Sequence, residues 1–226
     1  NVRICVGEVT LLVCTAALFV WWVCYWQFEY GRIRNLPDLE SWARTAGHIA
    51  NLFLAFALFP VARNSLWETA FGVPFERALG AHRVLGALWL AVSLLHMWLW
   101  HWSWAAAGTL ADIAWSIRPC KLHMGDDPGG HCDNFTIVLA ELMIAGATLM
   151  VTLAHPWFRR RFFEAFFYAH HFFLVIIVVS MLHAWSLWLV LVGPLAPWFV
   201  DRACRRVHSS AAVELVAAAN CPGNHV

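Results

Sequence analysis

The sequence predicts an all-α membrane protein, a bundle of six transmembrane helices, from its composition, its hydropathy and its apolar blocks. Of the 226 residues, 61% are apolar and 13% are charged, whereas a soluble domain is about 45–50% apolar and about 25% charged. The mean hydropathy is +0.62. A soluble fold would lack the polar residues to cover its surface. The net charge of +1 gives no basic footprint for nucleic acid, so none is expected as a partner.

Six apolar blocks account for the predicted helices, because a helix needs about 20 apolar residues to cross the hydrocarbon core of a bilayer. The predicted spans are residues 7–28, 43–59, 81–104, 135–155, 163–185 and 187–200. The first span is too long and too aromatic for a signal peptide. The sixth span is short and contains Pro194 and Pro197, so we expect it to be kinked or to begin earlier.

Arginine sets the predicted orientation, because Lys121 is the only lysine. One set of span ends carries Arg63, Arg77, Arg83, Arg159, Arg160, Arg161, Arg202, Arg205 and Arg206, and the opposite ends carry fewer arginines among many acids. The positive-inside rule places the arginine-rich ends in the cytoplasm. Because the number of spans is even, both termini are expected on that side. The membrane is expected to be the plasma membrane. Cys120 and Cys132 flank a loop predicted to be external, where they either form a disulfide or remain free thiols.

Four histidines occupy two of the predicted spans, two in each. His82 and His96 are 14 residues apart, and His170 and His183 are 13 apart. At 1.5 Å per residue these spacings correspond to about 21 Å and about 19.5 Å along a helix. A histidine inside a membrane is costly and is by default a functional candidate. Both spans run in the same direction, so we expect His82 to face His170 near the cytoplasmic side and His96 to face His183 near the external side.

This pattern predicts two stacked haem b groups, each held by one imidazole from each span. The four histidines would be the ligands of the haem irons. Zinc is disfavoured because its ligands converge at one depth, and the sequence has no Cys-x-x-Cys-His motif for covalent haem attachment. Arg83 and Arg63 are candidate partners of the inner haem propionates. The alternative for both arginines is ordinary positive-inside charge.

The angular positions of His170 and His183 do not fit one face of an ideal helix. At about 100° per residue, a spacing of 14 returns to within about 40° of the same helix face, whereas 13 misses by about 140°. Either the helix around His170 and His183 contains a π-bulge or a similar irregularity, or two haems approach it from different directions. His171 is a competing ligand, but its spacing of 12 is still about 120° off.

Three stretches of the chain resemble the NADPH oxidases and ferric reductases. FALFPVARNSLWETAFGVPFERALGAHRVLGALWLAVSLLH is similar to their second-to-third helix region, FYAHHFFLVIIVVSMLHAW to their second histidine pair, and WLVLVGPLAPWFVDRACRR to their sixth helix. The resemblance implies a ferric reductase-like transmembrane domain over residues 1–207 and a cytoplasmic dehydrogenase domain that binds FAD and NADPH. Residues 208–226 suggest a strand and a Pro-Gly turn, which we expect to begin the FAD-binding barrel of that domain.

The resemblance implies electron flow from NADPH through FAD and the two haems to an external acceptor, either O2, giving superoxide, or a ferric chelate. Arg44 matches an arginine that oxidases place beside the outer haem, where its charge would stabilise superoxide; the alternative is an interfacial arginine. Trp100 stands where oxidases have a histidine, with His101 beside it. His48, four residues after Arg44, is a hypothetical substitute for that histidine. Ile176 stands where some oxidases place an aromatic residue between the haems.

Two alternative functions and the role of one charged residue stay open from the sequence. The chain could be a di-haem b-type cytochrome of another kind, such as a quinol or ascorbate oxidoreductase subunit. It could also be a non-enzymatic channel or structural module whose histidines bind no cofactor. Within the membrane, Glu141 either bonds to a neighbouring helix or relays protons or charge.

Overall fold

The computed structural model describes residues 5–61, 66–110, 133–184 and 186–209. These residues form helices and contain no strand, which confirms the predicted all-α class. The helices are α1 (Val6–Gln27), α2 (Asp38–Leu58), α3 (Leu66–Phe71), α4 (Phe75–Ala106), α6 (Asp133–Ala154), α7 (Pro156–Arg161), α8 (Phe163–His170), α9 (Phe173–His183) and α10 (Ser186–Ser209), with a π-helix at Phe28–Ile33 and a 3₁₀ turn at Phe59–Val61.

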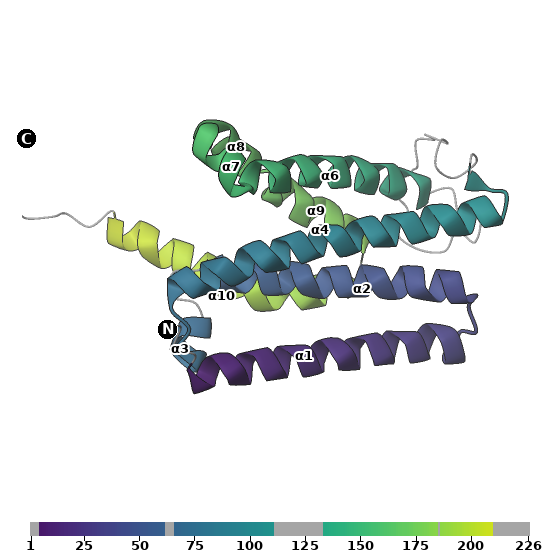
Figure 1. Cartoon of the computed structure of the whole chain (residues 1–226), viewed down its shortest axis with the longest axis horizontal. Helices are drawn as coiled ribbons and strands as arrows, with labels where there is room; N and C mark the ends of the chain where they lie inside the picture. Colours follow the sequence, from purple (N-terminus) through teal and green to yellow (C-terminus); the bar gives the residue numbers. More distant parts are fainter. Residues whose placement is uncertain (1–4, 62–65, 111–132, 185, 210–226) are drawn as a thin grey trace, which may run out of the picture.

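Six helical segments are long and apolar enough to cross a membrane, as the sequence predicts. They are Val6–Ile33, Asp38–Val61, Phe75–Ala106, Ile137–Ala154, Phe163–His183 and Ser186–Val207. Successive spans alternate in direction, so α1 begins and α10 ends at the same end of the bundle (Figure 1). The chain is therefore an integral, multi-pass membrane protein.

Helix α2 lies at the centre of the bundle, packed against α1, α4 and α10 (Figure 1). Its buried face consists largely of small residues, which let helix backbones approach closely inside a membrane. These residues are Ser41, Ala43, Thr45, Ala46, Ala50, Ala55 and Ala57. The close approach of α2 to α4 determines how the histidines on α4 are supported.

Two spans are longer than the sequence predicts. Helix α4 begins at Phe75, because Pro74 at its N-cap already has extended backbone angles, and its 32 residues reach about 48 Å. Helix α10 begins at Ser186 and continues through Pro194 and Pro197 to Ser209. The carboxylate of Asp201 bonds the guanidinium of Arg205 one turn later, which supports the helix beyond residue 200. Helix α10 thus includes residues 208 and 209, whereas residues 210–226 lie outside the described residues, and the strand and turn expected in this segment stay a prediction.

The fifth span contains the irregularity that the histidine spacing predicts, although it is a tightened turn and not a π-bulge. Helix α8 ends at His170 and α9 begins at Phe173. Between them, the amides of His171 and Phe172 donate to the carbonyls of Tyr168 and Ala169, three residues earlier. Such a turn has about 3.0 residues instead of 3.6, so it rotates the chain faster. This extra rotation helps both histidines of the span to face α4.

Candidate functional site

The inner histidine pair joins α4 to the end of α8. The ring centres of His82 and His170 lie 6.1 Å apart, and the ring planes are inclined by 75°. Nδ1 of His82 is 2.7 Å from the carbonyl oxygen of Ala57 on α2. Because a carbonyl only accepts, Nδ1 of His82 donates its proton to Ala57, which leaves Nε2 as the ring nitrogen that could hold a metal. The Nδ1 atom of His170 is buried and has no hydrogen-bond partner within the described part of the chain.

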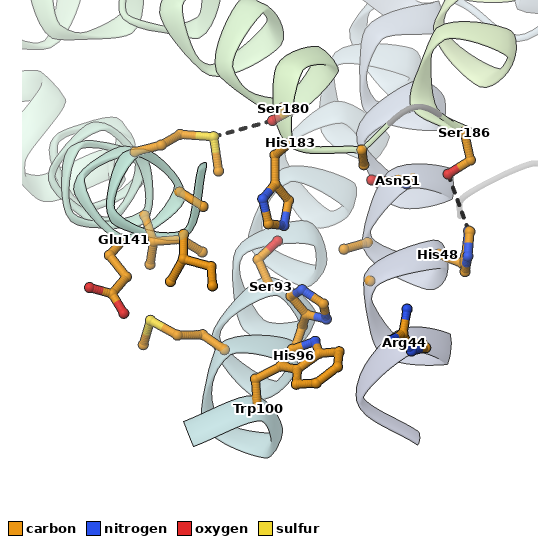
Figure 2. Close-up of a pocket in the computed structure, with 18 of the residues that line it drawn as sticks. Arg44, His48, Asn51, Ser93, His96, Trp100, Glu141, Ser180, His183 and Ser186 are labelled. Atoms are coloured by element: carbon orange, nitrogen blue, oxygen red, sulfur yellow. Dashed lines mark hydrogen bonds between the residues drawn. The ribbon is translucent and has the colours of Figure 1, made fainter. Parts of the chain in front are cut away.

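The outer pair repeats this arrangement at the other end of the same two spans, between α4 and α9. The ring centres of His96 on α4 and His183 on α9 are 6.2 Å apart, and their planes are inclined by 79°. Nδ1 of His96 donates to the carbonyl oxygen of Ala43 on α2 at 2.7 Å. Gly47, one turn further along α2, leaves room for the imidazole, since a Cβ there would lie 2.8 Å from Cε1 of His96. Figure 2 shows His96 and His183 approaching each other from the two helices.

The spacing within each pair suits one metal ion with two axial imidazoles. A metal–imidazole bond is about 2.0–2.1 Å, and a five-membered ring with sides of about 1.33 Å has its corners about 1.1 Å from its centre. Two such ring-to-metal distances add up to about 6.2–6.4 Å between ring centres. Within the described residues, no three His, Cys, Asp or Glu side chains converge as a metal-binding group. Two opposed imidazoles instead match the axial ligands of a haem, whose macrocycle supplies the other four donors.

A cavity of about 1080 Å³ adjoins the outer pair and is lined by residues from all six spans. Arg44 and His48 line it on α2, next to His96 and His183, and Glu141 lies across the cavity from them on α6 (Figure 2). The structure thus brings both residues proposed to act on the acceptor to the outer pair. The cavity contains charges of both signs, so its electrostatics depend on how each charge is paired.

Arg44 is held by an acidic and an aromatic partner. Its Nη2 atom is 2.7 Å from Oε1 of Glu40, one turn earlier on α2. Its guanidinium carbon lies 5.2 Å from the ring centre of Trp100 on α4. Trp100, which stands where oxidases have a histidine, therefore packs against the guanidinium by a cation–π contact. The charge of Arg44 is partly offset by Glu40, and its position is fixed.

His48 has several partners of its own. Its ring stacks on the indole of Trp26, with ring centres 3.6 Å apart and planes within 4°. Its Nε2 shares a hydrogen bond of 2.8 Å with the hydroxyl of Tyr30, and its Nδ1 lies 3.4 Å from the hydroxyl of Ser186. Since both ring nitrogens are engaged, the described contacts of His48 join α1, α2 and α10 and do not present a free imidazole to the cavity.

Glu141 pairs with the neighbouring helix, the first of its two predicted roles. Its Oε1 is 3.0 Å from Nε2 of His101 on α4. The nitrogen and oxygen are close enough for an ion pair, but Oε1 has no aligned hydrogen-bond donor among the described residues. Nδ1 of His101 bonds the carbonyl of Met97 at 2.8 Å. The pair therefore joins α6 to α4 at the side of the cavity.

The two arginines proposed to pair with haem propionates stay predictions. Arg83 follows His82 on α4 and is exposed. Arg63 lies outside the described residues, as do Cys120 and Cys132. Conversely, sequence reasoning missed Gly47. The run of small residues around it, Ala46-Gly47-His48-Ile49-Ala50, was a signal for close helix packing.

Comparisons with known proteins bear on the whole chain. A family model described as "Ferric reductase like transmembrane component" matches residues 46–181. The matched range contains His82, His96 and His170 and ends just before His183. Ferric reduction oxidase 2 of Arabidopsis thaliana is 28% identical over 234 aligned residues, which cover 97% of this chain and 30% of that protein. The chain thus spans about a third of the length of this curated relative.

Proposed function

Since the chain belongs to the ferric reductase-like transmembrane family, we propose that it transfers electrons across a membrane through two haem b groups. His82 and His170 would hold the inner haem, and His96 and His183 the outer one. When bound, the two haems would supply one-electron carriers at two depths of the bilayer. The observation that carries the proposal is the separation of the paired rings, 6.1 Å and 6.2 Å, which is close to the roughly 6.2–6.4 Å that a shared iron requires.

The residues around each pair would orient the ligands. The carbonyls of Ala57 and Ala43 accept the Nδ1 protons of His82 and His96, which leaves Nε2 for the metal and makes the imidazole more basic. His96 and His183 would both hold the outer haem, so the acceptor would bind beside that haem, against the residues of the adjoining cavity. The cavity next to His96 and His183 is the proposed acceptor site.

We propose that electrons enter at the end of the bundle where His82 and His170 lie. Their source would be a cytoplasmic dehydrogenase domain that binds FAD and NADPH. The support is the resemblance of the spans to NADPH oxidases and ferric reductases. The same proposal places both termini in the cytoplasm, which the arginine-rich ends support. It also places the protein in the plasma membrane.

For the acceptor we propose an anionic ferric chelate first. The support is the name of the relative, a ferric reduction oxidase, together with the cationic side chain of Arg44 in the cavity. O2 is the second candidate, since the same guanidinium would stabilise a nascent superoxide anion. The pairing of Arg44 with Glu40 weakens the attraction for either anion, so the two acceptors need a direct comparison.

A spectroscopic experiment on the purified chain tests the haem proposal. The parent protein should show a Soret shift and an α band after dithionite and should contain two haem equivalents. His82→Ala and His96→Ala should each lose one equivalent. His171→Ala and His101→Ala, which change histidines outside the two pairs, should retain both. A parent protein without an α band, or His96→Ala with two haems, would refute the proposal, and the channel or structural alternative would then return.

A kinetic experiment tests the acceptor. The dithionite-reduced protein would be mixed in a stopped-flow instrument with oxygenated buffer or with a ferric chelate under argon. Faster reoxidation by the chelate supports the ferric acceptor. Faster reoxidation by oxygen would transfer the proposal to the second candidate.

A further inference from the structure

His170 is held differently from the two histidines on α4. Nδ1 of His82 and Nδ1 of His96 each donate to a backbone carbonyl, whereas Nδ1 of His170 is buried without a hydrogen-bond partner in the described part of the chain. His170 is also the last residue of α8, beside the tightened turn. Its imidazole therefore lacks the hydrogen bond that normally fixes the ring plane of a metal ligand.

Two aromatic rings flank the imidazole of His170. The ring centre of Phe166, one turn earlier on α8, is 5.3 Å from that of His170, with the planes inclined by 39°. Phe173, across the turn, lies 6.4 Å away. Of the phenylalanines on α8, Phe166 is partly buried, whereas Phe163 and Phe167 are exposed. Phe166 is thus the ring on α8 that packs inward against the ligand.

Phe166 is itself held by a cation. The guanidinium carbon of Arg159 on α7 lies 6.0 Å from the centre of the Phe166 ring, within the range of a cation–π contact. Arg159 is partly buried, whereas the next residue, Arg160, is exposed. Contacts therefore lead from α7 through Phe166 to His170, and they connect a loop between two spans with the inner histidine pair.

We propose that Phe166, backed by Arg159, is a positioning residue that sets the ring plane of His170. This inference rests on the proposed inner haem site. Because Nδ1 of His170 has no acceptor among the described residues, the neighbouring rings would restrict the rotation of the imidazole about its bond to the helix. A change in Phe166 should therefore alter the electronic structure of the inner haem without removing the ligand.

Electron paramagnetic resonance and a redox titration of the solubilised full chain test this proposal. The low-spin haem signal depends on the relative orientation of the two axial imidazole planes, and each midpoint potential reports on ligand strength. Phe166→Leu should change the g-values and the midpoint potential of one haem and leave the other haem unchanged. Phe166→Tyr, which keeps the ring, should restore the parent values. Phe167→Leu is the matched control, because the Phe167 ring contacts His171, which lies outside both pairs.

A second pair of variants covers the outcome in which Phe166→Leu loses haem. Arg159→Gln should change the same haem signal in the same direction, and Arg160→Gln should not. If Phe166→Leu retains both haems with parent g-values and potentials, the proposal is wrong. It is equally wrong if Phe166→Leu loses haem while Arg159→Gln matches the parent, because Phe166 would then act only in general packing. A parent protein without haem bands would instead refute the proposed function, and this inference with it.

Discussion

Replacing Gly47 with alanine tests how closely α2 supports the outer histidine pair. An ideal Cβ at this position lies 2.8 Å from Cε1 and 3.0 Å from Nδ1 of His96. Carbon atoms in contact prefer about 3.5–4.0 Å, so the methyl group and the imidazole must separate by about 0.7 Å. His96 has little freedom to yield, because its Nδ1 is bonded to Ala43 on the same helix as Gly47.

The expected effect on the site is larger than the effect on the fold. A displacement of about 0.7 Å exceeds the tolerance of about 0.2 Å in metal–ligand distances, and it breaks the bond from Nδ1 to Ala43. Loss of such a supporting contact typically weakens metal binding by about 10–100-fold, or about 1.4–2.7 kcal/mol. Overpacking costs about 1–3 kcal/mol of stability, but alanine returns about 0.8–1.0 kcal/mol of helix propensity. The variant should therefore fold and bind the outer haem poorly.

The assay is haem content per protein chain, followed by titration of haem into the apoprotein. Gly47→Ala should lose about one of two equivalents, and the remaining weak site should refill at about 10–100-fold higher haem concentration. Gly86→Ala on α4 is the matched control, since nothing lies within 4 Å of its ideal Cβ. Two tightly bound haems with a parent-like spectrum in Gly47→Ala would refute the reasoning that α2 fixes the position of His96.

Three further predictions concern other contacts. Gly146→Ala should lower the unfolding free energy by about 1–3 kcal/mol, because its Cβ would overlap the ring of Phe172 at the junction of α8 and α9. The loss should be measured as a lower Tm in detergent. Glu141→Gln should cost less than about 1 kcal/mol and leave haem content unchanged, since each partner of the Glu141–His101 pair is about a third exposed. Arg44→Gln should slow stopped-flow reoxidation by an anionic ferric chelate about fivefold at low salt, because two opposite charges about 4 Å apart in water attract by about 1 kcal/mol. The difference in rate between the variant and the parent should shrink at high salt.

Each of these predictions has a contradicting result. A parent-like Tm for Gly146→Ala, with Gly86→Ala as the reference, would mean that the Phe172 ring moves at no cost. Loss of a haem equivalent in Glu141→Gln would show that the carboxylate supports the outer site. An equal slowing of Arg44→Gln at low and high salt would exclude an electrostatic role for the guanidinium.

The six spans and the depths of the four histidines could be predicted from the sequence because both depend on local quantities. Hydropathy over about 20 residues identifies a span, and a constant rise per residue turns the spacing of His82 and His96 into a distance. The off-phase spacing of His170 and His183 also predicted an irregular fifth span. Its form, a tightened turn supported by Phe172 against Gly146, could not be predicted, because the supporting residue lies on α6.

The proposed roles of the cavity residues were harder to predict. The sequence places His48 one turn after Arg44, which suggested a free imidazole beside the acceptor. In the structure Trp26, Tyr30 and Ser186 surround His48 instead. Two of these partners come from the end of the first span and one from the start of the last, and no local pattern announces such a meeting.

The sequence by itself determined the kind of protein: an all-helical membrane domain with two pairs of histidines at two depths. Only the tertiary structure decided how far apart the paired rings lie, which carbonyls of α2 hold the two histidines of α4, and why position 47 is a glycine. The physical reason is the range of the interactions. Transfer into lipid and helical rise act on each segment alone, whereas the orientation of an imidazole depends on atoms that other helices bring within a few ångströms.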